Sequence, residues 1–243
     1  MLQERDRQEY SVLQIVAQST SPVGSGYLSR EMDRLAQTIS EATAGRLLNR
    51  LDQQGLTDKM GFQGRVLTDE GQKRLKELET IATRNQKGEE FFSALRSRSK
   101  EGLIDILIAR RAIERELARL AAIHATDEEI REMWTVQMIQ LETFTRDMHA
   151  AEIDVQFHRL IAKAARNPVL YSAVEMIRQD GQLTPVLEYI RLTVHSVISY
   201  DHAQIVGAIE RRDPGLADEA MVKHIESLIQ DVNKYWDHVK DNE

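Results

Sequence analysis

Hydrophobic residues at helical spacing divide the front of the chain into short amphipathic helices. Residues 7–18 place Tyr10, Leu13 and Val16 mostly on one face, which is the pattern of a half-buried helix. Residues 25–36 repeat the spacings of three and four. The stretch STSPVG between them breaks the pattern. Two helices separated by a short loop are therefore predicted.

A third helix and a hairpin are predicted from end signals and turn residues. Ser40 suits the N-cap of the segment ATAGRLLNRLDQQ, and Gly55 suits the C′ position that ends it. Two short strand-like runs follow around Gly61 and Gly64, and a new helix start follows at Thr68. Three helices and then a β-hairpin are the element order of a winged helix-turn-helix.

The rest of the chain has the hydrophobic spacing of helices. The predicted helices cover residues 68–84, 89–98, 102–123, 127–147, 150–165, 168–180, 183–211 and 214–238. Start signals at Thr126 and Asn167 support two of these boundaries. The polar segment 85–88 is the best linker candidate. We therefore predict a mainly α protein with a winged helix over 1–80, a linker over 81–89 and a helical domain over 90–243.

Composition narrows the class of protein. The 243 residues contain no cysteine, which excludes disulfides and thiolate metal sites. No run approaches the roughly 18 apolar residues of a membrane span, so a cytoplasmic protein without membrane contact is expected. The net charge of -7 argues against general polyanion binding. The first 80 residues hold 11 Lys and Arg against 12 Asp and Glu, which leaves them free to read DNA.

The third helix of the front domain is the candidate DNA reader. In a helix-turn-helix the second helix of the pair enters the major groove. The candidate DNA-binding residues on or before this helix, with one on the hairpin, are Ser40, Glu41, Thr43, Arg46, Asn49, Arg50 and Arg65. Arg46 and Arg50 lie one turn apart and suit guanine or phosphate, and Arg65 suits a wing cation. A winged helix that contacts only proteins is the alternative.

Residues 10–75 resemble a known winged helix. The segments SPVGSGYLSREM and LLNRLDQQGLTDKMGFQGRVLTDEGQKRL are similar to the front of NrpR-type transcriptional repressors, in which "GL…G..GR.LT..G" marks the wing. This resemblance implies DNA binding by the front domain.

One acid and three imidazoles in the second part are candidate metal ligands. Asp154 and His158 lie four residues apart, one turn along a helix face. Such a pair alone also fits a surface ion pair or a core histidine. His202 and His224 each lie eleven residues from Asp213, where a new helix starts. In an antiparallel helix pair both would lie about 16 Å from the turn, side by side.

These four residues suit a divalent cation of the Zn, Ni or Mn class. Their segments also resemble a family. The order of "R..IE..LA.LAA" from Arg110, "D..FH..IA.A..NP.L" from Asp154 and "H..I..AI..RDP..A......HI" from His202 is similar to the ligand-binding domain of FCD-type GntR-family regulators. The resemblance implies an all-helical antiparallel bundle that holds a metal on Asp154, His158, His202 and His224.

The same resemblance implies a small organic-acid effector and a homodimer on palindromic operator DNA. Arg110 matches a pocket arginine of the family, since a guanidinium pairs with a carboxylate in bidentate fashion, although it could simply pair with Glu114 along its helix. His195, two turns before His202, is a weaker effector candidate. The usual "PSER.LA…GVSR.TVR.AL" winged helix of this family is missing, so the reading domain has been exchanged.

The sequence therefore predicts a ligand-responsive transcription factor that is not an enzyme. A metal-dependent enzyme acting on a small carboxylate is an alternative, because an Asp/His₃ cation can activate water. Against this alternative, no motif places a general base beside the ligands, and the winged helix would be unexplained.

Overall fold

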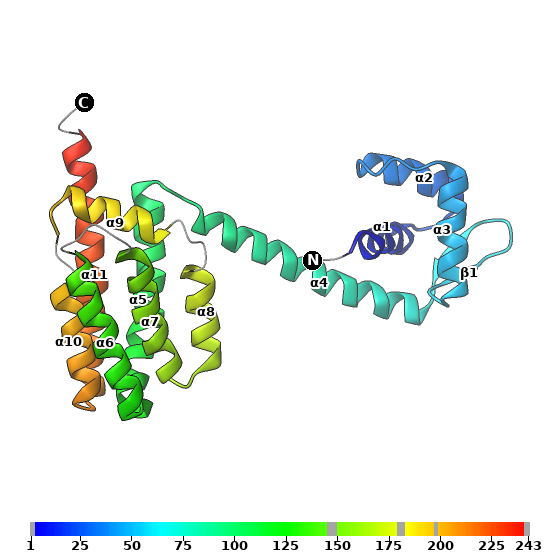
Figure 1. Ribbon diagram of the computed structural model, residues 1–243. Coiled ribbons are helices and arrows are strands. Elements are labelled where there is room, and N and C mark those ends of the chain that lie inside the picture. The colour runs from blue at the N-terminus through cyan, green and yellow to red at the C-terminus, as the bar shows by residue number, and fades with distance from the viewer. Residues whose placement is uncertain (1–2, 145–149, 179–182, 197–198, 241–243) are drawn as a thin grey trace. The chain divides into compact units, whose positions relative to one another are not determined.

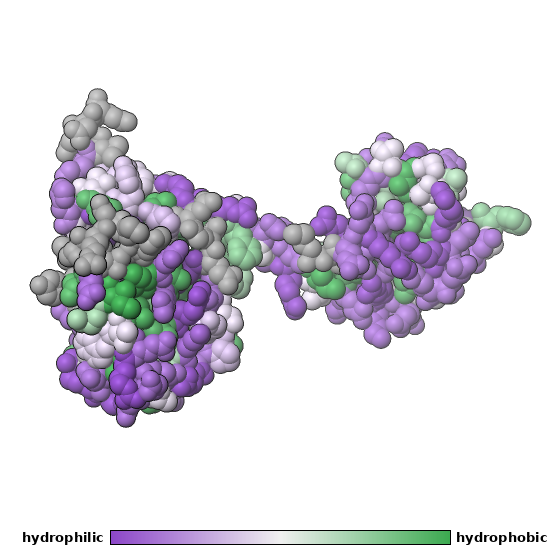
Figure 2. All heavy atoms as spheres, in the orientation of Figure 1, coloured by the Kyte–Doolittle hydropathy of each residue, from purple (hydrophilic) through white to green (hydrophobic). Residues whose placement is uncertain are grey.

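The structure is a computed structural model that describes residues 3–144, 150–178, 183–196 and 199–240 (Figure 1). The chain folds as two compact units, Met1–Phe92 and Ser93–Glu243, called unit 1 and unit 2 below. Hydrophilic side chains cover most of the visible face of unit 1 (Figure 2). No helix among the described residues is long and apolar enough to cross a membrane.

Unit 1 has the element order predicted for a winged helix. Its elements are α1 (Glu4–Gln18), α2 (Ser25–Arg34), α3 (Glu41–Gln53), β1 (Thr57–Lys59), β2 (Arg65–Leu67) and the start of α4 (Asp69–Leu95). The two strands pair antiparallel, with Thr57 opposite Leu67. The inward faces of these helices bury one apolar core that includes Leu13, Leu28 and Leu48.

Both predicted ends of α3 are confirmed. Ser40 Oγ accepts a hydrogen bond of 3.2 Å from the Thr43 amide, which satisfies one free donor of the first turn. Gly55 adopts a φ of +72°. The Leu56 amide then reaches back to the Leu51 carbonyl at 3.0 Å, which ends the helix.

The hairpin is fixed to the loop before α2. The Val23 amide donates to the Arg65 carbonyl at 2.8 Å, and the Arg65 amide donates to the Val23 carbonyl at 3.0 Å. Gly64 has a φ of +136°, and a Cβ there would lie 2.5 Å from the Val23 carbonyl carbon. Only glycine fits at this contact.

Helix α4 differs from the prediction because it runs without a break through the expected linker 81–89. Glu90 accepts hydrogen bonds from Gln86 at 2.9 Å and from Lys87 at 2.7 Å, contacts that stabilise helix across the polar segment. Gly88 costs a helix only about 1 kcal/mol. Polar composition here therefore marks an exposed helix, and the contact boundary between the units falls after Phe92.

Unit 2 is entirely helical over its described residues. Its helices after α4 are α5 (Lys100–His124), α6 (Asp127–Phe144), α7 (Ala150–Ala164), α8 (Pro168–Arg178), α9 (Leu183–Thr193), α10 (Ser199–Glu210) and α11 (Pro214–Lys240). Helix α5 packs against α11, α7 and α8, while α6 packs against α7 and α10. The predicted helical bundle is confirmed.

The single helix predicted over 183–211 is wrong, because α9 ends at Thr193 and α10 begins at Ser199. His195 adopts a φ of +55°, and the Ser196 amide donates to the Arg191 carbonyl at 3.0 Å. This helix end uses a left-handed residue other than glycine, so the sequence carries no usual stop signal. The last residues of the helices predicted over 127–147 and 168–180 lie outside the described residues.

Gly64→Ala is expected to destabilise unit 1, because a Cβ would clash with the Val23 backbone at a positive φ. The cost should be about 1–3 kcal/mol or more, seen as faster hydrogen exchange of α1 and α3 amides in the full-length protein. Gly61→Asn is the matched control, since Gly61 has a φ of +56° and open space around it. Unchanged exchange in Gly64→Ala would contradict this account of the hairpin.

Candidate functional site

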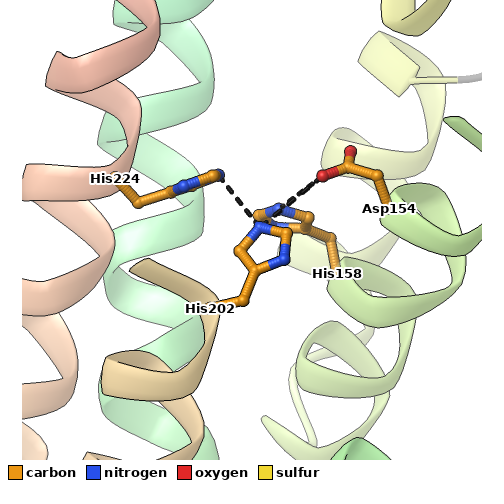
Figure 3. A group of neighbouring side chains, drawn as sticks. All are labelled: Asp154, His158, His202 and His224. Atoms are coloured by element: carbon orange, nitrogen blue, oxygen red, sulfur yellow. Dashed lines mark hydrogen bonds and ion pairs between the residues drawn. The ribbon is translucent and has the colours of Figure 1, made fainter. Parts of the chain in front are cut away.

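The four predicted metal ligands meet inside unit 2. Asp154 and His158 come from α7, His202 from α10 and His224 from α11. Their side chains point toward one another (Figure 3), and one donor atom from each lies within 4.8 Å of the others. His202 Nε2 lies 3.4 Å from His224 Nε2, and Asp154 Oδ1 lies 3.6 Å from His202 Nε2 and 3.7 Å from His158 Nε2.

The turn between α10 and α11 brings His202 and His224 together. Asp213 Oδ1 accepts from the amides of Gly215 and Leu216, both at 3.0 Å, and so caps α11 as predicted. The two helices leave this turn antiparallel and pack along each other. Equal sequence distances from the turn therefore place the two imidazoles at the same height.

The donor atoms fit a divalent cation in spacing and chemistry. Metal bonds of about 2.0–2.1 Å place neighbouring ligand atoms roughly 3–3.5 Å apart, close to the separations observed. Burial lowers the pKa of His158, His202 and His224, so their rings are neutral and offer a lone pair. Burial alone would raise the pKa of Asp154, but His158 and Arg178 lower it further, which keeps its carboxylate ionised.

A buried carboxylate beside the cluster joins three positive or polar groups. Glu114 on α5 accepts from Arg110 Nε at 2.6 Å and from Arg178 Nη2 at 3.0 Å. His158 Nδ1 lies 2.6 Å from its second oxygen, although the ring N–H is not well aligned. Burial raises the pKa of Glu114, and the charges of Arg110, Arg178 and His158 bring it well below its usual range.

Arg178 had not been predicted as a site residue, and it also touches a ligand. Its Nη1 lies 3.4 Å from Asp154 Oδ2, while the other oxygen of Asp154 faces the histidines. Arg178 lies at the end of α8, sixteen or more residues from any ligand before or after it. No local motif links it to the cluster.

A second buried ion pair lies in the same bundle. Arg191 Nε on α9 lies 3.4 Å from Asp231 Oδ2 on α11, and both side chains are almost fully buried. Arg191 Nε and Nη2 and Asp231 Oδ2 have no hydrogen-bond partner among the described residues. Arg191 feels the charges of Asp154, Asp231 and Asp201, so it faces the cluster. Sequence reasoning had not identified this pair.

The two predicted effector residues lie in different surroundings. Arg110 is buried, pairs with Glu114 as the alternative reading allowed, and still has one unpartnered atom, Nη2, among the described contacts. His195 is exposed just after the end of α9. The structure thus brings Arg110, but not His195, among the buried charges around the cluster.

The predicted reading face of α3 is mostly exposed. Arg46 and Asn49 are exposed and Arg50 is half-buried. Arg46 Nη2 donates to Thr43 Oγ1 at 3.1 Å, which holds its side chain along the helix. The Glu41 carboxylate lies against Gly26 in the first turn of α2, 3.1 Å from an added Cβ there. Glu41 is thus positioned beside α2.

Arg65 is held inside unit 1, in contrast to the free wing cation that the sequence predicted. Its Nε donates to Asp52 at 3.1 Å, and its Nη2 donates to Asn49. Only 13% of its side chain is exposed. Arg65 therefore joins the hairpin to α3, and the exposed cation of the two described strands is Lys59.

Comparison with protein families assigns each part of the chain. The model of the FCD domain matches residues 105–227, which contain all four ligands, Arg110 and Glu114. The model of the Ribonuclease R winged-helix domain matches residues 10–75. The front of the chain is therefore a winged helix like that of Ribonuclease R, in place of the pattern usual beside an FCD domain.

Curated relatives match part of the chain. The HTH-type transcriptional repressor NanR of Cronobacter sakazakii is 33% identical over 118 residues, 47% of this chain and 45% of that protein. NanR of Escherichia coli K12 is 36% identical over 120 residues, 47% of this chain and 44% of that protein. The chain thus spans about half the length of the curated relatives it matches.

A solved structure shares the fold. E. coli McbR/YncC aligns over 97% of this chain and 100% of that chain, with a TM-score of 0.50 and 14% sequence identity. At this identity the likeness is one of fold alone.

We expect His202→Ala with His224→Ala to abolish divalent-metal binding, because it removes two of four converging donors. Elemental analysis of wild type and of the double variant, each purified in the same way, measures this. His124→Ala is the control, since His124 is exposed at the end of α5. Equal metal content in all three proteins would exclude the cluster as the metal site.

Proposed function

Since this chain belongs to the FCD domain family, we propose that it is a ligand-responsive transcriptional regulator, of FCD-type GntR kind. Unit 1 binds operator DNA through α3, and unit 2 binds a divalent metal together with a small organic acid. The observation that carries the proposal is the convergence of Asp154, His158, His202 and His224 in one buried cluster.

The charges around the cluster favour an anionic effector. Three buried arginines, Arg110, Arg178 and Arg191, are opposed by Glu114, Asp154 and Asp231, with Asp201 3.8 Å from His224. The histidines are neutral. These groups sum to one negative charge, so a divalent cation leaves one positive charge over. One carboxylate balances that charge.

Unpartnered donors in the same region suit that carboxylate. Buried polar groups are nearly always hydrogen-bonded, yet Arg110 Nη2 and Arg191 Nε and Nη2 have no partner among the described residues. A guanidinium binds a carboxylate in bidentate fashion. Arg110 and Arg191 are therefore our candidates for effector contact, while the metal holds the acid by direct coordination.

DNA binding follows from the winged helix and its exposed arginines. Arg46 and Arg50 provide the positive charge of α3, and Lys59 that of the hairpin. We propose that two chains bind an operator as a homodimer in the cytoplasm. The effector then acts by binding one arrangement of the two reading domains more tightly than another.

The alternatives are less well supported. The matched relatives are named transcriptional repressors, which favours a regulator over a metal-dependent enzyme. An interaction-only winged helix leaves the exposed arginines of α3 without a role.

Arg46→Ala with Arg50→Ala is expected to weaken binding to DNA upstream of the gene. It should also flatten the salt dependence, by about 0.9 in the slope for each lost phosphate contact. Fluorescence anisotropy at several salt concentrations measures both. Arg84→Ala, an exposed position on α4, serves as control. Wild-type binding by the double variant would rule out α3 as the reader.

Arg191→Lys is expected to weaken acid binding at least about tenfold, because lysine keeps the charge but loses the two parallel donors. Thermal shifts of the Zn²⁺-loaded protein with a panel of small carboxylic acids identify a binder, and calorimetry then gives its Kd. Arg159→Lys is the control, since Arg159 pairs with Glu175 on the outer side of α7. The same Kd in wild type and Arg191→Lys would remove Arg191 from the site.

A further inference from the structure

Two of the three histidine rings are held from outside through the same nitrogen. His158 Nδ1 lies 2.6 Å from Glu114 Oε2, and His202 Nδ1 lies 2.6 Å from Gln140 Oε1. Their other nitrogens, Nε2, face Asp154 Oδ1 at 3.7 Å and 3.6 Å. An acceptor beside Nδ1 requires a proton there, which leaves the lone pair on Nε2.

The two acceptors belong to helices that supply no ligand. Glu114 lies on α5 and Gln140 on α6, and both are almost fully buried. Arg110 and Arg178 fix the carboxylate of Glu114 at 2.6 Å and 3.0 Å. The acceptors are thus placed by the packing of the bundle and do not depend on a bound ion.

The third ring is held less closely. His224 Nδ1 has no hydrogen-bond partner among the described residues, and Asp201 Oδ2 lies 3.8 Å away. His224 therefore provides a comparison within the same cluster, a ligand whose tautomer the bundle does not fix.

We propose that Glu114 and Gln140 are positioning residues of the metal centre, which fix His158 and His202 as Nδ1–H tautomers so that both bind the cation through Nε2. The proposal rests on the metal-binding function proposed above. Acceptors of this kind orient ligand rings, and their loss typically costs 10–100-fold in metal affinity. Glu114 also connects this role to Arg110, so the effector arginine and a metal ligand share one carboxylate.

The tautomers are tested on the metal-free protein. Long-range ¹H–¹⁵N NMR at neutral pH should show His158 and His202 protonated on Nδ1. In Gln140→Leu the His202 signal should move to the Nε2–H form or to a mixture, while His158 stays unchanged. Gln137→Leu is the matched control, one turn earlier on α6 and equally buried.

Zn²⁺ affinity, measured by competition with a chromogenic chelator, gives the second readout. Gln140→Leu should bind about 10–100-fold more weakly than wild type. Glu114→Gln keeps an acceptor but loses the charge, so it should keep the tautomer of His158 and lose affinity. Glu116→Gln, at a half-exposed position on α5, should match wild type.

The outcomes separate the inference from the proposed function. Nε2–H forms of His158 and His202 in wild type, or wild-type Zn²⁺ affinity in Gln140→Leu, overturn the positioning role even when the cluster binds metal. Failure of wild type to bind Zn²⁺, Ni²⁺ or Mn²⁺ overturns the metal function itself, whatever the tautomers.

Discussion

The interior of unit 2 depends on one buried carboxylate. Glu114 lies within hydrogen-bonding distance of Arg110, Arg178 and His158, three groups from three different helices. Each buried charge is costly by itself, and removal of one partner of such a group costs roughly 3–5 kcal/mol. The arginines and the carboxylate therefore hold one another in place. The ligand cluster is assembled on this framework, and its shape does not depend on the cation alone.

That framework explains how an acid and a cation can act on each other. Arg110 pairs with Glu114, and Glu114 lies against His158, which is a metal ligand. An acid that takes the free donor of Arg110 alters the field at Glu114 and so at His158. By linkage, any gain in acid affinity from the metal equals the gain in metal affinity from the acid. Helix α5 carries both Arg110 and Glu114 and begins five residues after the end of α4.

The limits of sequence reasoning follow from the range of the interactions involved. Caps and helical spacing are local, so Ser40, Gly55 and Asp213 were found. His202 and His224 were found because one turn relates them. Gln140, Arg178 and Arg191 reach the cluster only through packing of separate helices, which no spacing encodes. Helix α9 ends on left-handed His195, and Arg65 is held by Asn49 and Asp52; neither feature has a local signal.

The modest charge of the reading domain constrains how the regulator can work. The first 80 residues carry 11 Lys and Arg against 12 Asp and Glu, and Arg65 is bound to Asp52. One domain therefore neutralises few phosphates and binds DNA weakly by charge alone. Two domains joined in a dimer gain affinity by effective concentration, but only when their spacing matches the operator. Control of that spacing is then sufficient for an effector in unit 2 to control DNA binding.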